Sequence, residues 1–143
     1  MTGADARQWM SNDTRQNTGR PSARRRSDLC SSGRSTIAAP WKPDASLADE
    51  FGNVKSEFLW SALDCTGGFA VLPLPDGLAI VLGELCTSIA GEVACGEHCV
   101  VVGWPLAVEG RKRLAGSAVY ARSGRLVAKA RAVWIEVPLN TWN

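Results

Sequence analysis

At 143 residues and 45% apolar content, the chain has room for one domain with a sizeable core. Its net charge of +2 is unevenly spread. Residues 1–36 hold seven Arg and three Asp, a net of +4, whereas residues 37–143 hold nine basic and eleven acidic residues, a net of −2. A slightly acidic folded part argues against nucleic-acid binding by bulk electrostatics. No apolar run is long enough to span a bilayer and no signal-peptide core is visible, so we expect no membrane contact.

Five cysteines make an odd count, without the dense spacing of a disulfide scaffold. Cys95 and Cys99 enclose His98, the only histidine, but a zinc site built from these three residues would lack a usual fourth ligand. We therefore predict buried or free thiols, no metal and no cofactor. Thiols of this kind fit a reducing cytoplasm.

Residues 1–36 are polar, rich in Arg and Ser, and almost free of branched aliphatic residues. Such a segment does not bury enough apolar surface to offset its ordering entropy, so we predict a disordered extension. The cluster at residues 24–26 is either a solvated run of charge or part of a nucleic-acid or targeting tail. The folded domain is predicted over residues 37–143, and residues 36–41 are expected to form the end of a short strand.

Residues 56–71 have the helical period of an amphipathic helix. The expected apolar stripe consists of Phe58, Ala62, Cys65 and Phe69, widened by Leu59 and Leu63. Ser56 is the predicted N-cap, because its hydroxyl can accept a free amide of the first turn. Asp64 lies about two turns inside the helix, on a different side from the stripe and beside Trp60.

Four long strands are predicted after the helix, over residues 78–90, 97–108, 111–121 and 125–137. In the last of these, the even positions 126–134 are apolar, whereas Arg125, Lys129 and Arg131 occupy odd positions. This alternation predicts an antiparallel sheet with one covered and one wet face. Three alanines in the middle of the apolar face would let a helix approach closely. The predicted core tryptophans are Trp60, Trp104 and Trp134.

These elements predict an α+β fold in which a curved antiparallel sheet grips one helix. Their order, with the segments WSALDCTGGFAV and VVVGWPLAVEGRKRLAGSAVYARSGRLVAKARAVWIEV, resembles the hotdog-fold acyl-CoA thioesterase superfamily over roughly residues 38–137. The resemblance implies a sheet wrapped around one central helix, and a homodimer or dimer of dimers. It also implies an active site at the dimer interface, near the N-terminal end of the helix.

Many members of that superfamily carry a His-Gly-Gly motif, followed nine residues after the His by an acid in the helix. Asp64 matches the acidic position, but Lys55-Ser56-Glu57 stands where the glycine motif is expected. The resemblance implies that Asp64 is the catalytic carboxylate, attacking directly or activating water. A structural acid is the alternative reading of the same residue.

The remaining candidate substrate-binding residues follow from the same picture. They are Trp60 and Leu59 as a pocket wall, Glu57 in the first turn, and Arg111, Lys112 and Arg113 as a grip for the phosphates of coenzyme A. A first-turn acid favoured by the helix dipole is the alternative for Glu57, and a solvated strand end is the alternative for the basic trio. The predicted function is hydrolysis of acyl-CoA thioesters, and the alternative is a non-catalytic hotdog module that binds acyl groups or only dimerises.

Overall fold

The computed structural model describes residues 36–142, so the predicted extension, including residues 24–26, lies almost entirely outside the described residues. The chain forms β1 (Ile37–Trp41), η3 (Ala45–Leu47), α2 (Ser56–Ala70), β2 (Leu78–Ile89), β3 (Cys99–Glu109), β4 (Lys112–Ala121), β5 (Leu126–Pro138) and η4 (Leu139–Trp142). The predicted helix and all four long strands are present, with ends shifted by at most two residues.

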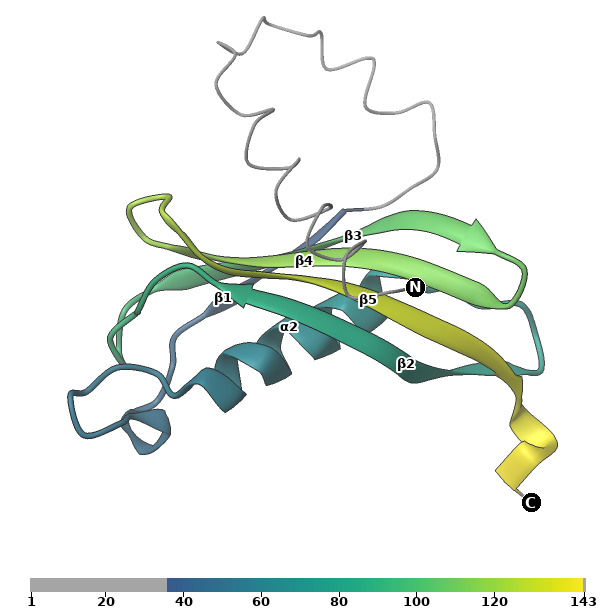
Figure 1. Ribbon diagram of the computed structural model, residues 1–143, viewed down its shortest axis with the longest axis horizontal. Coiled ribbons are helices and arrows are strands. Elements are labelled where there is room, and N and C mark those ends of the chain that lie inside the picture. The colour runs from purple at the N-terminus through teal and green to yellow at the C-terminus, as the bar shows by residue number, and fades with distance from the viewer. Residues whose placement is uncertain (1–35, 143) are drawn as a thin grey trace, which may run out of the picture. The chain divides into compact units, whose positions relative to one another are not determined.

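The strands form one antiparallel sheet in the order β1-β3-β4-β5-β2. Figure 1 shows the sheet curving over α2, which lies along its concave side. The short strand expected at residues 36–41 is β1, and it pairs with β3 from Ile37 opposite Gly103 to Trp41 opposite Cys99. β2 is the opposite edge of the sheet and pairs only with β5.

Small side chains on the concave face let the helix lie close to the sheet, as the sequence predicts. A Cβ on Gly103 would lie 2.6 Å from the Thr66 carbonyl oxygen. The Ser117 hydroxyl of β4 donates a hydrogen bond of 2.9 Å to the Leu63 carbonyl oxygen. Ala130 is fully buried in the core beside these contacts. The backbones of helix and sheet therefore meet with little side-chain bulk between them.

The predicted apolar stripe of the helix is confirmed for Leu59 and Leu63 and is wrong for Cys65 and Phe69. The buried residues of α2 are Leu59, Leu63, Thr66, Gly67, Gly68 and Ala70. Phe69 is 64% exposed and Cys65 is exposed, whereas Phe58 and Ala62 are half-buried. The physical reason is the close approach: the two glycines fit against the sheet where a phenylalanine would not.

The start of the helix also differs from the prediction. Lys55 is the N-cap and makes no side-chain capping bond, and Ser56 is the first helical residue. Ser56 is therefore not the cap. The two glycines lie within the helix, where a Cβ on Gly68 would meet the Trp134 ring at 3.0 Å. They allow close packing and do not end the helix.

Two further predictions about burial are corrected. Trp134 is buried and Trp104 half-buried, but Trp60 is 43% exposed and is not a core residue. Lys129 and Arg131, expected on a wet face, are both buried. β5 has a neighbouring strand on each side, and the burial of Arg131 extends to its Nη1 atom.

Candidate functional site

Asp64 is the central feature of the candidate site. It is half-buried, and its Oδ1 atom is buried with no hydrogen-bond partner among the described residues. Desolvation raises the pKa of this carboxyl above its ordinary value. Burying a carboxylate oxygen without a hydrogen-bond partner costs free energy. Groups kept in this state are common at ligand-binding sites.

The side of the helix that carries Asp64 faces β5 and β2. Gly68 is one turn further along the same side and packs against Trp134 of β5. Trp134 pairs with Leu82 of β2, the edge strand. The carboxyl of Asp64 is therefore directed toward the β2 edge of the sheet rather than toward β1.

Thr87 lies at the same level of the sheet. The registers of the strands place Gly103, Ser117, Ala130 and Thr87 in one row across the concave face. Because Ser117 bonds the carbonyl of Leu63, the residue before Asp64, this row crosses beneath the turn that holds the acid. Thr87 Oγ1 is buried and has no hydrogen-bond partner within the described part of the chain.

Trp134 adds a third polar atom to this side of the helix. Its Nε1 is buried and unpaired among the described residues, and it would lie 3.8 Å from a Cβ placed on Gly67. The site thus combines one acceptor that titrates, Asp64, with two donors, Thr87 and Trp134. A carboxylate beside donors can take a proton from water or attack a carbonyl, while a donor holds the carbonyl oxygen.

Sequence reasoning singled out Asp64 and missed Thr87. A threonine in a long strand is ordinary, and its position under one helical turn depends on strand register. Register across four strands is not readable from one sequence.

Of the other predicted site residues, only Trp60 is a neighbour of this cluster, one turn before Asp64 on the same side of α2. Leu59 is 2% exposed and packs in the core, so it does not line an open surface. Trp60 is partly exposed and Glu57 is exposed in the first turn of α2. The first turn has no side-chain cap, and the Phe58 amide bonds the Lys55 carbonyl oxygen, so the amides of Ser56 and Glu57 are the ones available to an anion.

The basic trio lies at the other end of the helix. Arg113 forms an ion pair with Glu136 of β5 and donates a hydrogen bond of 3.3 Å to the carbonyl oxygen of Val71, just after α2. Its guanidinium therefore holds the helix end to the sheet. Arg111 and Lys112 are exposed at the turn between β3 and β4.

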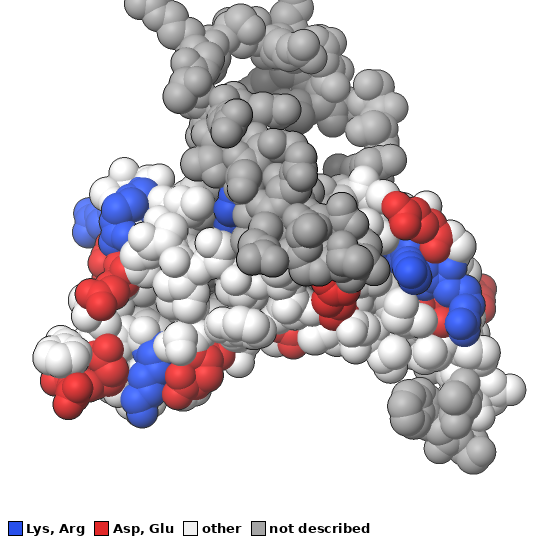
Figure 2. Space-filling model, in the orientation of Figure 1, with Lys and Arg blue, Asp and Glu red and all other residues white. Residues whose placement is uncertain are grey.

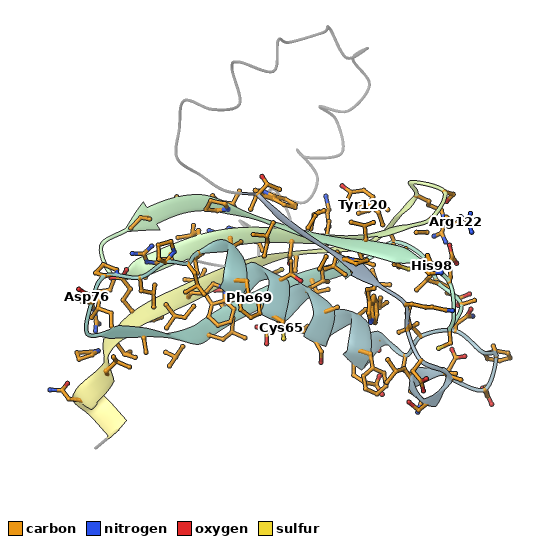
Figure 3. The ribbon with its side chains drawn as sticks, turned by 180° about the vertical axis from the view of Figure 1, so that it is seen from behind. Cys65, Phe69, Asp76, His98, Tyr120 and Arg122 are labelled. Atoms are coloured by element: carbon orange, nitrogen blue, oxygen red, sulfur yellow. The ribbon has the colours of Figure 1, made fainter. Side chains whose placement is uncertain are left out.

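Charged side chains of both signs gather mostly at the two ends of the face shown in Figure 2. His98 is exposed just before β3, at the same end of the sheet as Arg122 and away from the middle of α2, where Cys65 lies (Figure 3). Over residues 36–142, no three His, Cys, Asp or Glu side chains come together as metal ligands. The four cysteines in this range are free. No described helix has the length and apolarity of a membrane span.

No family model matches the sequence, and no curated protein matches it closely. Solved structures do match the fold. A hypothetical protein of Thermus thermophilus, a thioesterase superfamily member, aligns with a TM-score of 0.68 at 15% identity, covering 76% of this chain and 85% of that one. A thioesterase of Haemophilus influenzae gives 0.68 at 17%, covering 75% of each chain. A hypothetical thioesterase protein of Streptococcus pneumoniae with coenzyme A gives 0.66 at 17%, covering 72% and 82%.

The chain therefore has the hotdog fold, a curved antiparallel sheet around one helix, shared with structures of the thioesterase superfamily. A Streptococcus mutans protein bound to acetyl CoA has the same fold, with a TM-score of 0.66 at 12% identity over 72% of this chain and 82% of that one.

Proposed function

We propose that this protein hydrolyses acyl-CoA thioesters, with Asp64 as the catalytic carboxylate. The observation that carries the proposal is the buried, unpartnered Oδ1 of Asp64, on a helical turn that lies over the strand row containing the unpartnered hydroxyl of Thr87. Buried polar atoms are nearly always paired, so two unpaired atoms on one side of the helix indicate a place for a polar ligand. Two proteins of the same fold bind coenzyme A or acetyl CoA, and this supports acyl-CoA as the proposed ligand class.

The proposed reaction uses an ionised Asp64. The carboxylate takes a proton from water as the water oxygen attacks the thioester carbon, or it attacks that carbon itself and water then hydrolyses the resulting anhydride. The carbon–sulfur bond breaks, and the coenzyme A thiolate leaves and is protonated. In this proposal the Thr87 hydroxyl donates a hydrogen bond to the carbonyl oxygen, where negative charge develops.

A second protomer completes the pocket in this proposal. Eight residues separate Ser56 from Asp64, about 12 Å along the helix axis, so one carbonyl does not touch both Asp64 and the amides of the first turn. A helix from another protomer supplies those amides. β2 offers the contact: it is a sheet edge of 12 residues, and Leu82 and Ile89 are 41% and 42% exposed. We propose a homodimer through this edge.

Arg111 and Lys112 are the proposed partners of the coenzyme A phosphates, because both are exposed. Arg113 is assigned a structural role, since its guanidinium is already paired.

The direct test measures thiol release from acetyl-, octanoyl- and benzoyl-CoA by the full chain and by Asp64→Asn. We expect Asp64→Asn to lower kcat/KM by about 10²–10⁴-fold. Asp76→Asn is the matched control, because Asp76 is exposed in the loop before β2 at one end of the sheet (Figure 3). It should retain wild-type activity.

Equal rates for the wild type and Asp64→Asn would remove Asp64 from the mechanism. Release from no ester by a folded dimer would favour the non-catalytic acyl-binding module. Light scattering after size exclusion measures the assembly, and a monomer at assay concentration would contradict the shared pocket.

A further inference from the structure

A cavity of about 370 Å³, largely open to the surface, lies on the other side of α2, between the helix and β1. It is lined by Ala39, Pro40, Trp41, Leu47, Phe58, Ser61, Ala62, Cys65, Thr66 and Val101. Its volume is within the range of small-molecule sites. Figure 3 shows this side of the helix, with Cys65 projecting from α2. The cavity is distinct from the Asp64 side, which faces β5 and β2.

The walls of the cavity are mostly apolar. The hydroxyl of Ser61 donates to the Glu57 carbonyl oxygen at 3.1 Å, and that of Thr66 donates to the Ala62 carbonyl oxygen at 2.8 Å. Both hydroxyl protons are therefore used within the helix. Cys65 adds a thiol, which packs like a small apolar group. Such walls favour a hydrocarbon over a charged group, because the lining contains no charged side chain to pair with a carboxylate or phosphate.

The cavity is joined to the Asp64 site across the outer surface of the helix. Ser61 lines the cavity and also lies three residues before Asp64, so the two are surface neighbours. Cys65 lies beside them and is exposed. The only charged residues of α2 are Asp64 and Glu57, and Glu57 lies in the first turn, one turn before Ser61. An alkyl chain can cross from one site to the other without passing a second charge.

We propose that this cavity binds the distal hydrocarbon of an acyl chain whose thioester carbonyl lies at Asp64. The inference rests on the proposed function and names its substrate class, medium-chain aliphatic acyl-CoA. The path from Asp64 to the cavity runs about a third of the way around the helix. Because the helix is about 10–12 Å in diameter, this path is roughly 10 Å long. An extended chain advances about 1.3 Å per carbon, so acyl groups of about eight carbons or more reach the cavity.

The test compares two neighbouring residues of β1. Ala39 lines the cavity, whereas Ala38 does not, because consecutive strand residues point to opposite faces. Both are exposed, so a larger side chain at either site leaves the core intact. Ala39→Phe fills the cavity and Ala38→Phe is the matched control. Ala62→Phe fills the cavity from the helix side and provides a second, independent variant.

The first measurement is kcat/KM for butanoyl-, octanoyl- and dodecanoyl-CoA. Each methylene removed from water favours binding about fourfold, so the wild type should gain at least tenfold from octanoyl- to dodecanoyl-CoA. Ala39→Phe and Ala62→Phe should lose that gain and keep the butanoyl rate, while Ala38→Phe should behave as the wild type. Identical chain-length profiles in Ala39→Phe and the wild type would overturn the proposal.

The second measurement does not depend on catalysis. Trp41 lines the cavity, so 12-bromododecanoic acid should quench its fluorescence in the wild type and in Asp64→Asn. Trp41→Phe should lose the quenched component, and Ala39→Phe should not show saturable quenching. If no thioester is hydrolysed but this pattern holds, the proposed function fails and the cavity stands as an acyl-binding site. Absence of saturable quenching in the wild type would overturn the cavity assignment even if hydrolysis is observed.

Discussion

Replacing Gly103 with alanine tests the close contact between helix and sheet that positions Asp64. The new Cβ would lie 2.6 Å from the Thr66 carbonyl oxygen, 2.9 Å from its Cγ2 and 3.1 Å from its carbonyl carbon. Two of these three atoms belong to the helix backbone, so no side-chain rotation removes the clash. The helix must move away from β3, or the strand must bend.

We expect Gly103→Ala to lower the free energy of unfolding by about 1–3 kcal/mol, the usual cost of overpacking a well-filled core. For a domain of roughly a hundred residues, each kcal/mol lowers Tm by about 4 °C, so the melting temperature should fall by about 4–12 °C. The same shift lifts the Leu63–Asp64 turn from Ser117, so activity toward any accepted thioester should fall as well.

The assay is thermal and urea unfolding of the full chain, with Gly67→Ala as the matched control. A Cβ on Gly67 would meet nothing closer than 3.8 Å, and alanine is the better helix former by about 1 kcal/mol. Gly67→Ala should therefore raise Tm. Equal or higher stability of Gly103→Ala would refute the packing described here.

Two further predictions concern charged groups. The pKa of Asp64 is raised in the folded protein, so the folded state holds more protons than the unfolded state between the two pKa values, and stability falls as pH rises through that window. Asp64→Asn should therefore be more stable than the wild type at pH 7 and should lose this advantage below about pH 4. Urea unfolding at several pH values measures the difference in stability. A difference that does not change with pH would contradict the desolvation argument. Because ionised Asp64 is required, kcat/KM should fall on acidification at a pH above that of an ordinary Asp. Glu136→Gln removes the charged partner of Arg113 and should cost about 1–2 kcal/mol in urea unfolding, less at high salt, and an unchanged midpoint would show that the ion pair does not hold the helix end.

The local pattern of residues is sufficient to predict the elements of this fold. Period-two alternation and turn residues predict the strands that became β2 to β5, because these signals come from residues close together in the chain. The alanines of β5 predict a close-packed helix, and Ala130 and Ala132 are indeed fully buried. The acidic position of Asp64 is also readable, because it depends on spacing within one helix.

The side of the helix that is buried was decided by tertiary packing. Apolar periodicity favours a stripe through Phe69, but the sheet accepts Gly67 and Gly68 instead, since its own small residues leave no space for a phenyl ring. Trp60 lies one turn before Asp64, at the edge of the buried side of α2, and is 43% exposed.

What the sequence determined by itself is therefore the set of elements, their order and the acid in the middle of the helix. Only the tertiary structure placed Thr87 under the turn of Asp64, committed Arg113 to Glu136 and opened a cavity beside β1. These features join residues far apart in the chain, and they follow from strand register and from how the helix is rotated on the sheet. Both are set by the packing of all the strands together, which no local pattern encodes.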